Sequence, residues 1–88
     1  MSVLKAYAVL DVKVSAFLLP MFFPTTPSAL RGFGAAAVDP SHDFSKFPED
    51  YILYEIGSWD SELGMLSALA VPTPLAKALD FKVKDTTG

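Results

Sequence analysis

The sequence predicts an α+β fold, in which a four-stranded antiparallel sheet in β-β-α-β-β order carries one main helix on one face. Three patterns indicate this fold. Two apolar runs near the start of the chain are typical of a hairpin, a Thr-Pro pair marks the start of a helix, and a second hairpin turns near residue 60.

The first hairpin is predicted from the runs Leu4–Leu10 and Phe17–Phe23, which the stretch DVKVSA separates. Side chains alternate across a strand, so the first run has two different faces. One face carries Leu4, Ala6, Ala8 and Leu10, and the other carries Val3, Lys5, Tyr7 and Val9. We expect the alanine face to lie under the helix, because small side chains allow close packing. Pro20 cannot donate to a strand ladder, which predicts an edge strand or a bulge there.

The helix is predicted to start with Thr26 as its cap and Pro27 in the first helical position. Apolar residues then recur at helical spacing, and Arg31 lies on the opposite side. The two glycines of the GFG stretch at 32–34 favour close packing over a ligand-binding role. Asp39-Pro40-Ser41 ends the helix, and residues 41–50 are predicted to form a loop or a short helical turn.

The second hairpin is predicted from Tyr51–Ile56, a turn around Asp60 and Gly64, and a strand over Met65–Ala70. We therefore expect a single α+β domain over residues 1–70. Residues 71–88 are expected to form a C-terminal extension. In it, Thr73-Pro74 starts a short docked helix, and the last residues fray.

Composition places the chain among folded proteins, because 51% of its 88 residues are hydrophobic and 19% are charged. It has no cysteine, and its longest uncharged run near the start, residues 14–23, is too short to span a bilayer. We expect a cytoplasmic protein that makes no membrane contact. The net charge of −3 is uneven: residues 38–62 carry −6, whereas residues 1–37 carry +2.

The chain contains few residues from which a catalytic site is built. Its one histidine, His42, stands beside Asp43 in the predicted loop, where such a pair is typical of a solvated surface. No serine lies in a GxSxG setting and no glycine-rich phosphate loop occurs. We expect no enzymatic activity, no cofactor and no metal.

The middle of the chain carries a series of short motifs. They are Asp11-Val12-Lys13, the helix residues Ala29, Arg31 and Phe33, the step Asp39-Pro40-Ser41, and the strand PEDYILYEIGSWD over residues 48–60. This series resembles the small nonstructural protein of gokushoviruses and related microviruses, which are bacteriophages with single-stranded DNA genomes. Phe47 replaces the usual histidine of that family.

The resemblance implies a nonstructural phage protein that works in the cytoplasm of the host bacterium. It implies a role in genome replication or in supplying single strands for packaging, and it implies binding of single-stranded DNA without sequence preference. The last twenty residues match nothing specific in the family.

The predicted strands are apolar on both faces, and one main helix covers only one of them. One hypothesis is that the second face binds single-stranded DNA, with aromatic residues stacking on bases and cations contacting phosphates. The candidate nucleic-acid-binding residues are Lys5, Tyr7, Lys13, Arg31 and Trp59.

The other hypothesis is that a second copy of the chain covers this face, since large exposed apolar patches mark interfaces. The candidate oligomer-interface residues are Leu18, Phe22 and Leu53. The two hypotheses combine in a homodimer, or a higher oligomer, that binds DNA. The alternative is a homo-oligomeric interaction protein that contacts phage or host replication proteins without binding DNA.

Overall fold

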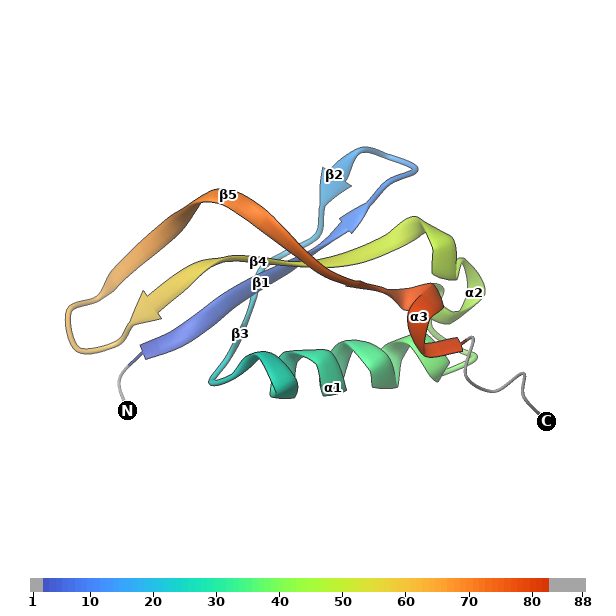
Figure 1. Ribbon diagram of the computed structural model, residues 1–88, viewed down its shortest axis with the longest axis horizontal. Helices are drawn as coiled ribbons and strands as arrows, with labels where there is room; N and C mark the ends of the chain where they lie inside the picture. Colours follow the sequence, from blue (N-terminus) through green and yellow to red (C-terminus); the bar gives the residue numbers. More distant parts are fainter. Residues whose placement is uncertain (1–2, 83–88) are drawn as a thin grey trace.

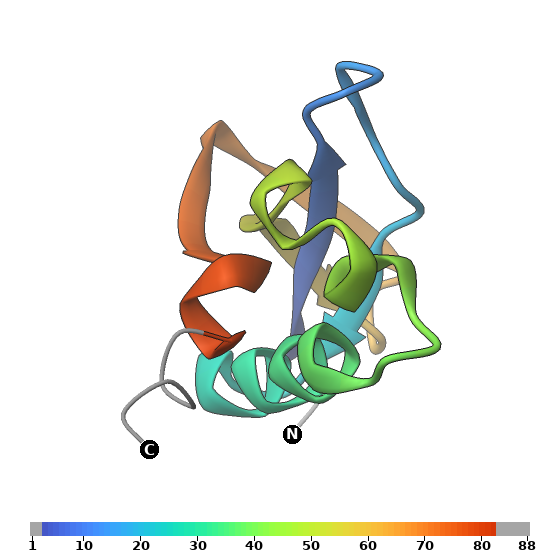
Figure 2. The same ribbon diagram turned by 90° about the vertical axis from the view of Figure 1, so that its right-hand side faces the viewer.

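A computed structural model describes residues 3–82 of the chain and shows an antiparallel sheet with a helix along one face (Figures 1 and 2). The predicted α+β class is confirmed. In chain order the elements are β1 (Val3–Asp11), β2 (Ala16–Phe17), β3 (Met21–Phe23), α1 (Thr26–Val38), α2 (Asp43–Lys46), the 3-10 helix η1 (Pro48–Asp50), β4 (Tyr51–Asp60), β5 (Met65–Lys77) and α3 (Ala78–Lys82). The sheet order is β2-β1-β4-β5, and β3 also pairs with β1.

The second strand of the first hairpin is divided into two short strands. β2 pairs with the end of β1, with Phe17 opposite Leu10, and β3 pairs with its first half, with Phe22 opposite Ala6. Pro20 lies in the gap between β2 and β3. The sequence predicted an edge strand or a bulge at Pro20, and the edge position is confirmed. The edge strand is also interrupted at Pro20, which has no N–H to donate.

The start of α1 lies one residue earlier than predicted, so the assignment of Thr26 as the cap is wrong. Thr25 has an extended backbone, and its Oγ1 accepts a hydrogen bond of 3.2 Å from the Ser28 N–H. The Ser28 hydroxyl lies 3.3 Å from the Thr25 backbone nitrogen, which completes a capping box. Thr26 instead forms a 2.9 Å hydrogen bond with the Tyr7 hydroxyl and so ties α1 to β1.

The core lies between α1 and the sheet, and the prediction of which β1 face it contacts is wrong. Tyr7 and Val9, predicted to face away from the helix, are 0% and 1% exposed in the core, where Leu53 is also fully buried. The small residues that permit close packing are the helix residues Ala29 and Ala37. α1 also supplies Phe33, which is 4% exposed, so these alanines pack among large side chains from both the helix and the sheet.

The two glycines of α1 have the close-packing role that their sequence predicts. A Cβ at Gly34 would lie 2.8 Å from the ring of Phe81, and one at Gly32 would lie 3.3 Å from the ring of Phe23. Phe81 belongs to α3 and also makes an edge contact with Phe33, with ring centroids 5.8 Å apart. The glycines therefore let β3 and α3 approach the helix.

The C-terminal part of the described chain departs from the prediction. β5 continues through residue 77, so the expected domain boundary at residue 70 lies inside a strand. Thr73 and Pro74 pair with β4 and do not start a helix; α3 starts at Ala78, which is fully buried. Lys82 Nζ donates to Ser45 Oγ at 2.9 Å and fixes α3 to α2. The expected frayed tail, residues 83–88, lies outside the described residues.

Candidate interaction surface

β4 contains an extra residue that decides which side chains share a face. Gly57 lies opposite Ala6 and Glu55 lies opposite Tyr7, so Ile56 has no partner on β1. Such a bulge shifts the alternation of side chains by one position. Trp59, which strict alternation places on the side of Leu53, therefore lies opposite Leu4 on the other face.

We call the face of the sheet opposite α1 the open face. The strand pairings and the hollows on its surface assign to it Leu4, Ala6, Phe17, Pro20, Phe22, Tyr54, Ile56, Trp59, Leu66 and Ala68. These ten are apolar or aromatic, and the pairings also place Lys77 on this face, opposite Ile52 at one end. Leu66 is 65% exposed and Phe22 is 41% exposed, so large side chains of this face are in contact with solvent.

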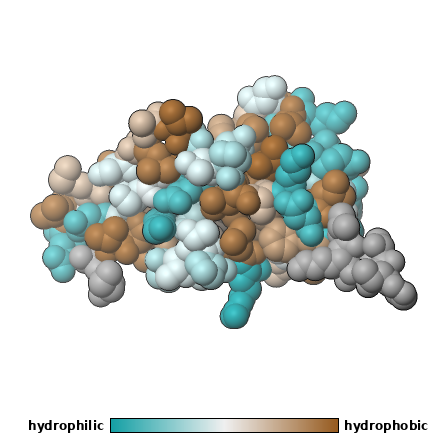
Figure 3. Space-filling model, in the orientation of Figure 1, coloured by the Kyte–Doolittle hydropathy of each residue, from teal (hydrophilic) through white to brown (hydrophobic). Residues whose placement is uncertain are grey.

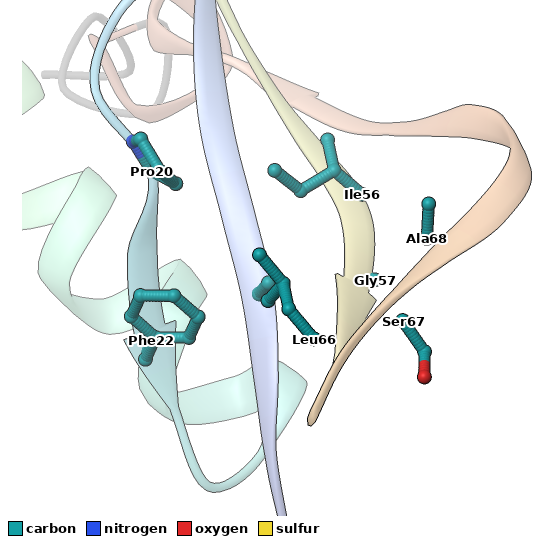
Figure 4. Close-up of a pocket in the computed structure, with 8 residues that line it drawn as sticks. Pro20, Phe22, Ile56, Gly57, Leu66, Ser67 and Ala68 are labelled. Carbon is teal, nitrogen blue, oxygen red and sulfur yellow. The ribbon is translucent and has the colours of Figure 1, made fainter. Parts of the chain in front are cut away.

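Two adjoining hollows on the open face share Phe22 and Leu66 as walls. The first has Ala6 and Gly57 among its lining residues and a volume of about 210 Å³. Figure 4 shows Phe22 on one side of it and Leu66 and Ile56 on the other, projecting over β1. The second hollow is lined by Leu4 and Trp59 as well as the two shared residues.

Gly57 is required where β4 and β5 approach each other. A Cβ at this position would lie 2.1 Å from the backbone oxygen of Ser67, closer than any side chain allows. The same stretch of β5 then leaves β4: Ala68 pairs with Gly57, but the next paired residue is Thr73, opposite Glu55. The intervening residues form the arch of β5 in Figure 1.

Exposed apolar side chains also lie along β5 and in the turn before it. Leu63, Met65, Leu66, Leu69 and Val71 are all exposed. In Figure 3 brown patches lie near the β4–β5 turn and at the arch, with paler surface between them. The other end of the open face carries an aromatic pair, since Phe17 and Tyr54 stack edge to face with centroids 5.2 Å apart.

The open face carries almost no charge. Of the strand residues that the described pairings place on it, only Lys77, opposite Ile52 at one end, is charged. Aromatic and aliphatic groups without cations suit contact with another apolar surface. A chain of phosphates instead requires cations along its path.

The predicted nucleic-acid-binding residues are not brought together. Tyr7 is inside the core and unavailable to a base, and Trp59 is half-buried on the open face. Lys5 pairs with Phe23 on the helix side, and Arg31 is exposed on α1. Lys13 is exposed in the turn after β1, at the opposite end of the sheet from Trp59. The five residues therefore do not form one surface.

Of the predicted oligomer-interface residues, Phe22 lines both hollows of the open face, and Leu18, which is 43% exposed, lies between β2 and β3. The prediction that Leu53 lies at an interface is wrong, because it lies opposite Val9 on the helix side and is fully buried beneath α1.

The sequence analysis did not identify Leu66 and Ile56 as surface residues. The signal for Leu66 was available, since it follows a turn that places it opposite Trp59.

Polar groups near α2 have structural partners. His42 Nδ1 accepts a hydrogen bond of 3.1 Å from the Phe44 N–H and caps α2. Asp39 accepts hydrogen bonds from the Ser41 N–H and hydroxyl, which lower the pKa of its carboxyl. The pKa of Tyr51 is raised by its loss of water contact and by the negative charges of Asp11, Asp43 and Asp50.

The chain matches the family of phage ORF5 proteins over residues 4–81. It belongs to this family. The match covers the sheet, α1 and nearly all of α3, and it confirms the phage origin that the motifs between residues 11 and 60 imply. No curated protein and no solved structure matches the chain. Within residues 3–82, no helix has the length and apolar character needed to cross a membrane.

Proposed function

We propose that this phage ORF5 protein is a non-catalytic interaction protein of the gokushovirus nonstructural type, which works in the host cytoplasm by binding phage or host replication proteins. The observation that carries this proposal is the open face. It is apolar across four strands and has its only charge, among the strand residues assigned to it, at one end. Surfaces of this kind in small proteins are contact sites for other proteins.

The phage infection itself provides the test. A phage that lacks this gene is supplied with the wild-type protein or with Leu66→Lys, which places a charge in the lining that the two hollows of the open face share. The matched control is Val38→Lys, since Val38 is also an exposed apolar residue, 49% exposed, but lies at the end of α1. We expect Leu66→Lys to lower the phage yield and Val38→Lys to preserve it. Equal yields from the two variants would contradict the proposal.

Single-stranded DNA binding is a second candidate, and one observation favours it. Phe17, Phe22, Tyr54 and Trp59 are aromatic residues on the open face, and bases stack on such residues with about 1–3 kcal/mol each. In this arrangement Trp59, the only tryptophan, reports directly on a stacked base. The cations that must accompany the bases are dispersed over other surfaces, which is why this candidate stands second.

Fluorescence separates the two candidates. If DNA binds, a thymidine oligonucleotide should quench Trp59, and a duplex should do so less because its bases are already paired. Replacing Lys5, Lys13 and Arg31 together by alanine should flatten the salt dependence, since each lost phosphate contact on a single strand removes about 0.7 from the slope. Unchanged Trp59 emission and unchanged anisotropy of a labelled oligonucleotide at low salt would retire DNA binding.

A further inference from the structure

We propose that a second copy of this chain covers the open face, packed face to face about a twofold axis. This inference rests on the part of the proposed function that makes the open face a contact surface for proteins, and it names a second copy of the chain as the partner there. Each copy then buries Phe22, Trp59 and Leu66 against the corresponding strands of the other.

The charge distribution fits a twofold contact. A twofold interface brings the same patch of both copies together, so a charge near its centre faces its own copy and is repelled. Phe22, Ile56 and Leu66 line the first hollow of the open face, and none of them is charged. Lys77 lies at one end, where it remains accessible to water.

The size of the face is adequate for a small stable dimer. β4 is 10 residues long, which at about 3.3 Å per residue spans about 33 Å, and four strands at about 4.8 Å spacing give a width of about 19 Å. The face therefore offers roughly 600 Å² per copy, and stable interfaces bury about 600–1,000 Å² per partner.

The hollows and large side chains of the open face also allow two copies of it to pack against each other. Its first hollow has the small residues Ala6 and Gly57 in its lining, and Phe22 and Leu66 stand on either side (Figure 4). A second copy turned through 180° presents the same walls and the same hollow. Large side chains of one copy then have small residues of the other to pack against, as in protein interiors.

The first experiment measures the mass of the protein by light scattering and native mass spectrometry as the concentration is lowered. We expect a dimer of twice 9.5 kDa for the wild type and for Val38→Lys. Leu66→Lys should raise the dissociation constant by about a hundredfold or more, because the dimer contains two copies of the site. Trp59 emission should shift to the red as the dimer dissociates.

The second experiment does not depend on how well a charged variant folds. The chain has no cysteine, so Leu66→Cys and Val38→Cys each introduce a single reactive thiol. A short bismaleimide should cross-link copies through position 66 and should not do so through position 38. Cross-linking at 38 alone, or a dimer that Leu66→Lys leaves intact, would place the contact elsewhere and overturn the inference.

A wild-type protein that stays monomeric in both experiments also overturns the dimer. The phage assay remains separate: a monomer whose Leu66→Lys variant lowers phage yield uses the open face for a different protein. A dimer whose disruption leaves phage yield unchanged keeps the inference and refutes the proposed function.

Discussion

The two faces of the sheet differ in what covers them. On the helix side the strands supply Tyr7, Val9 and Leu53, and α1 covers them with its alanines and Phe33. On the open side the middle of β1 supplies Ala6 and Ala8, and large residues come from its neighbours, such as Phe22 and Trp59, and from Leu4 near the start of β1. The first face is filled within one chain. The second has hollows that no element within residues 3–82 fills.

The comparison shows how one strand can serve both faces. Before the bulge, Leu53 enters the core, and after it Trp59 reaches the open face, although the two residues are six positions apart and strict alternation places them together. The unpaired Ile56 accounts for this change. The bulge therefore brings Trp59 to the open face while Leu53 stays in the core.

The largest effect is expected from a pair of leucine substitutions on the two faces. Leu53→Ala should lower the free energy of unfolding by about 2–5 kcal/mol, because it leaves a cavity among fully packed neighbours. Leu66→Ala, on the adjacent strand but 65% exposed, should change the stability of the monomer by less than about 0.5 kcal/mol.

Urea denaturation at protein concentrations below dimer dissociation measures both values. Repeating the titration at high concentration sharpens the comparison, since Leu66→Ala should then lose the stabilisation that association gives the wild type. Equal losses for the two variants at low concentration would show that the open face is packed like the core.

Local signals in the sequence predicted the elements well, and long-range ones were missed. Pro20 lies along an edge strand as expected, and the start of α1 was located within one residue, because both features depend on nearby backbone chemistry. The face that contacts α1 was assigned incorrectly. Alanines on either partner permit close packing, so the pattern of β1 alone does not determine which partner supplies them.

The sequence predicted only part of the candidate surface, again because local patterns do not determine which face of the sheet a side chain occupies. Phe22 and Trp59 lie on the open face, and their roles in an interface and in DNA binding stay predictions. Tyr7 and Leu53 were also predicted to lie at a binding surface, but both are buried in the core. Their burial depends on the register of β1 with β4 and on the bulge at Ile56. A strand of mixed apolar residues has no sequence pattern that reveals a bulge. Strict alternation therefore assigns the side chains beyond the bulge to the wrong faces.

A smaller effect, on the covered side, is expected at the cap of α1. Thr25→Ala should lower the free energy of unfolding by about 1 kcal/mol, because the Ser28 N–H loses its acceptor. Ser28→Ala removes the reciprocal half of the box and should cost less, since the cap itself remains. Thermal denaturation followed by circular dichroism measures both. An unchanged midpoint for Thr25→Ala would show that the cap does not stabilise the helix.

The smallest effect is expected at high pH, at the edge of the covered side. Loss of water contact, and then the charges of Asp11, Asp43 and Asp50, raise the pKa of Tyr51 above its ordinary value of 10.0 in the folded chain. The folded state therefore favours the neutral phenol. This contribution to stability is complete below about pH 10 and is lost as the pH rises through the higher pKa of the folded state.

Tyr51→Phe should lose less stability than the wild type between neutral pH and about pH 11 in urea titrations. Asp11→Asn should fall between the two, because it removes one of the nearby charges while leaving the phenol in place. If all three proteins lose stability equally, Tyr51 is not responsible for the alkaline sensitivity of this side of the sheet.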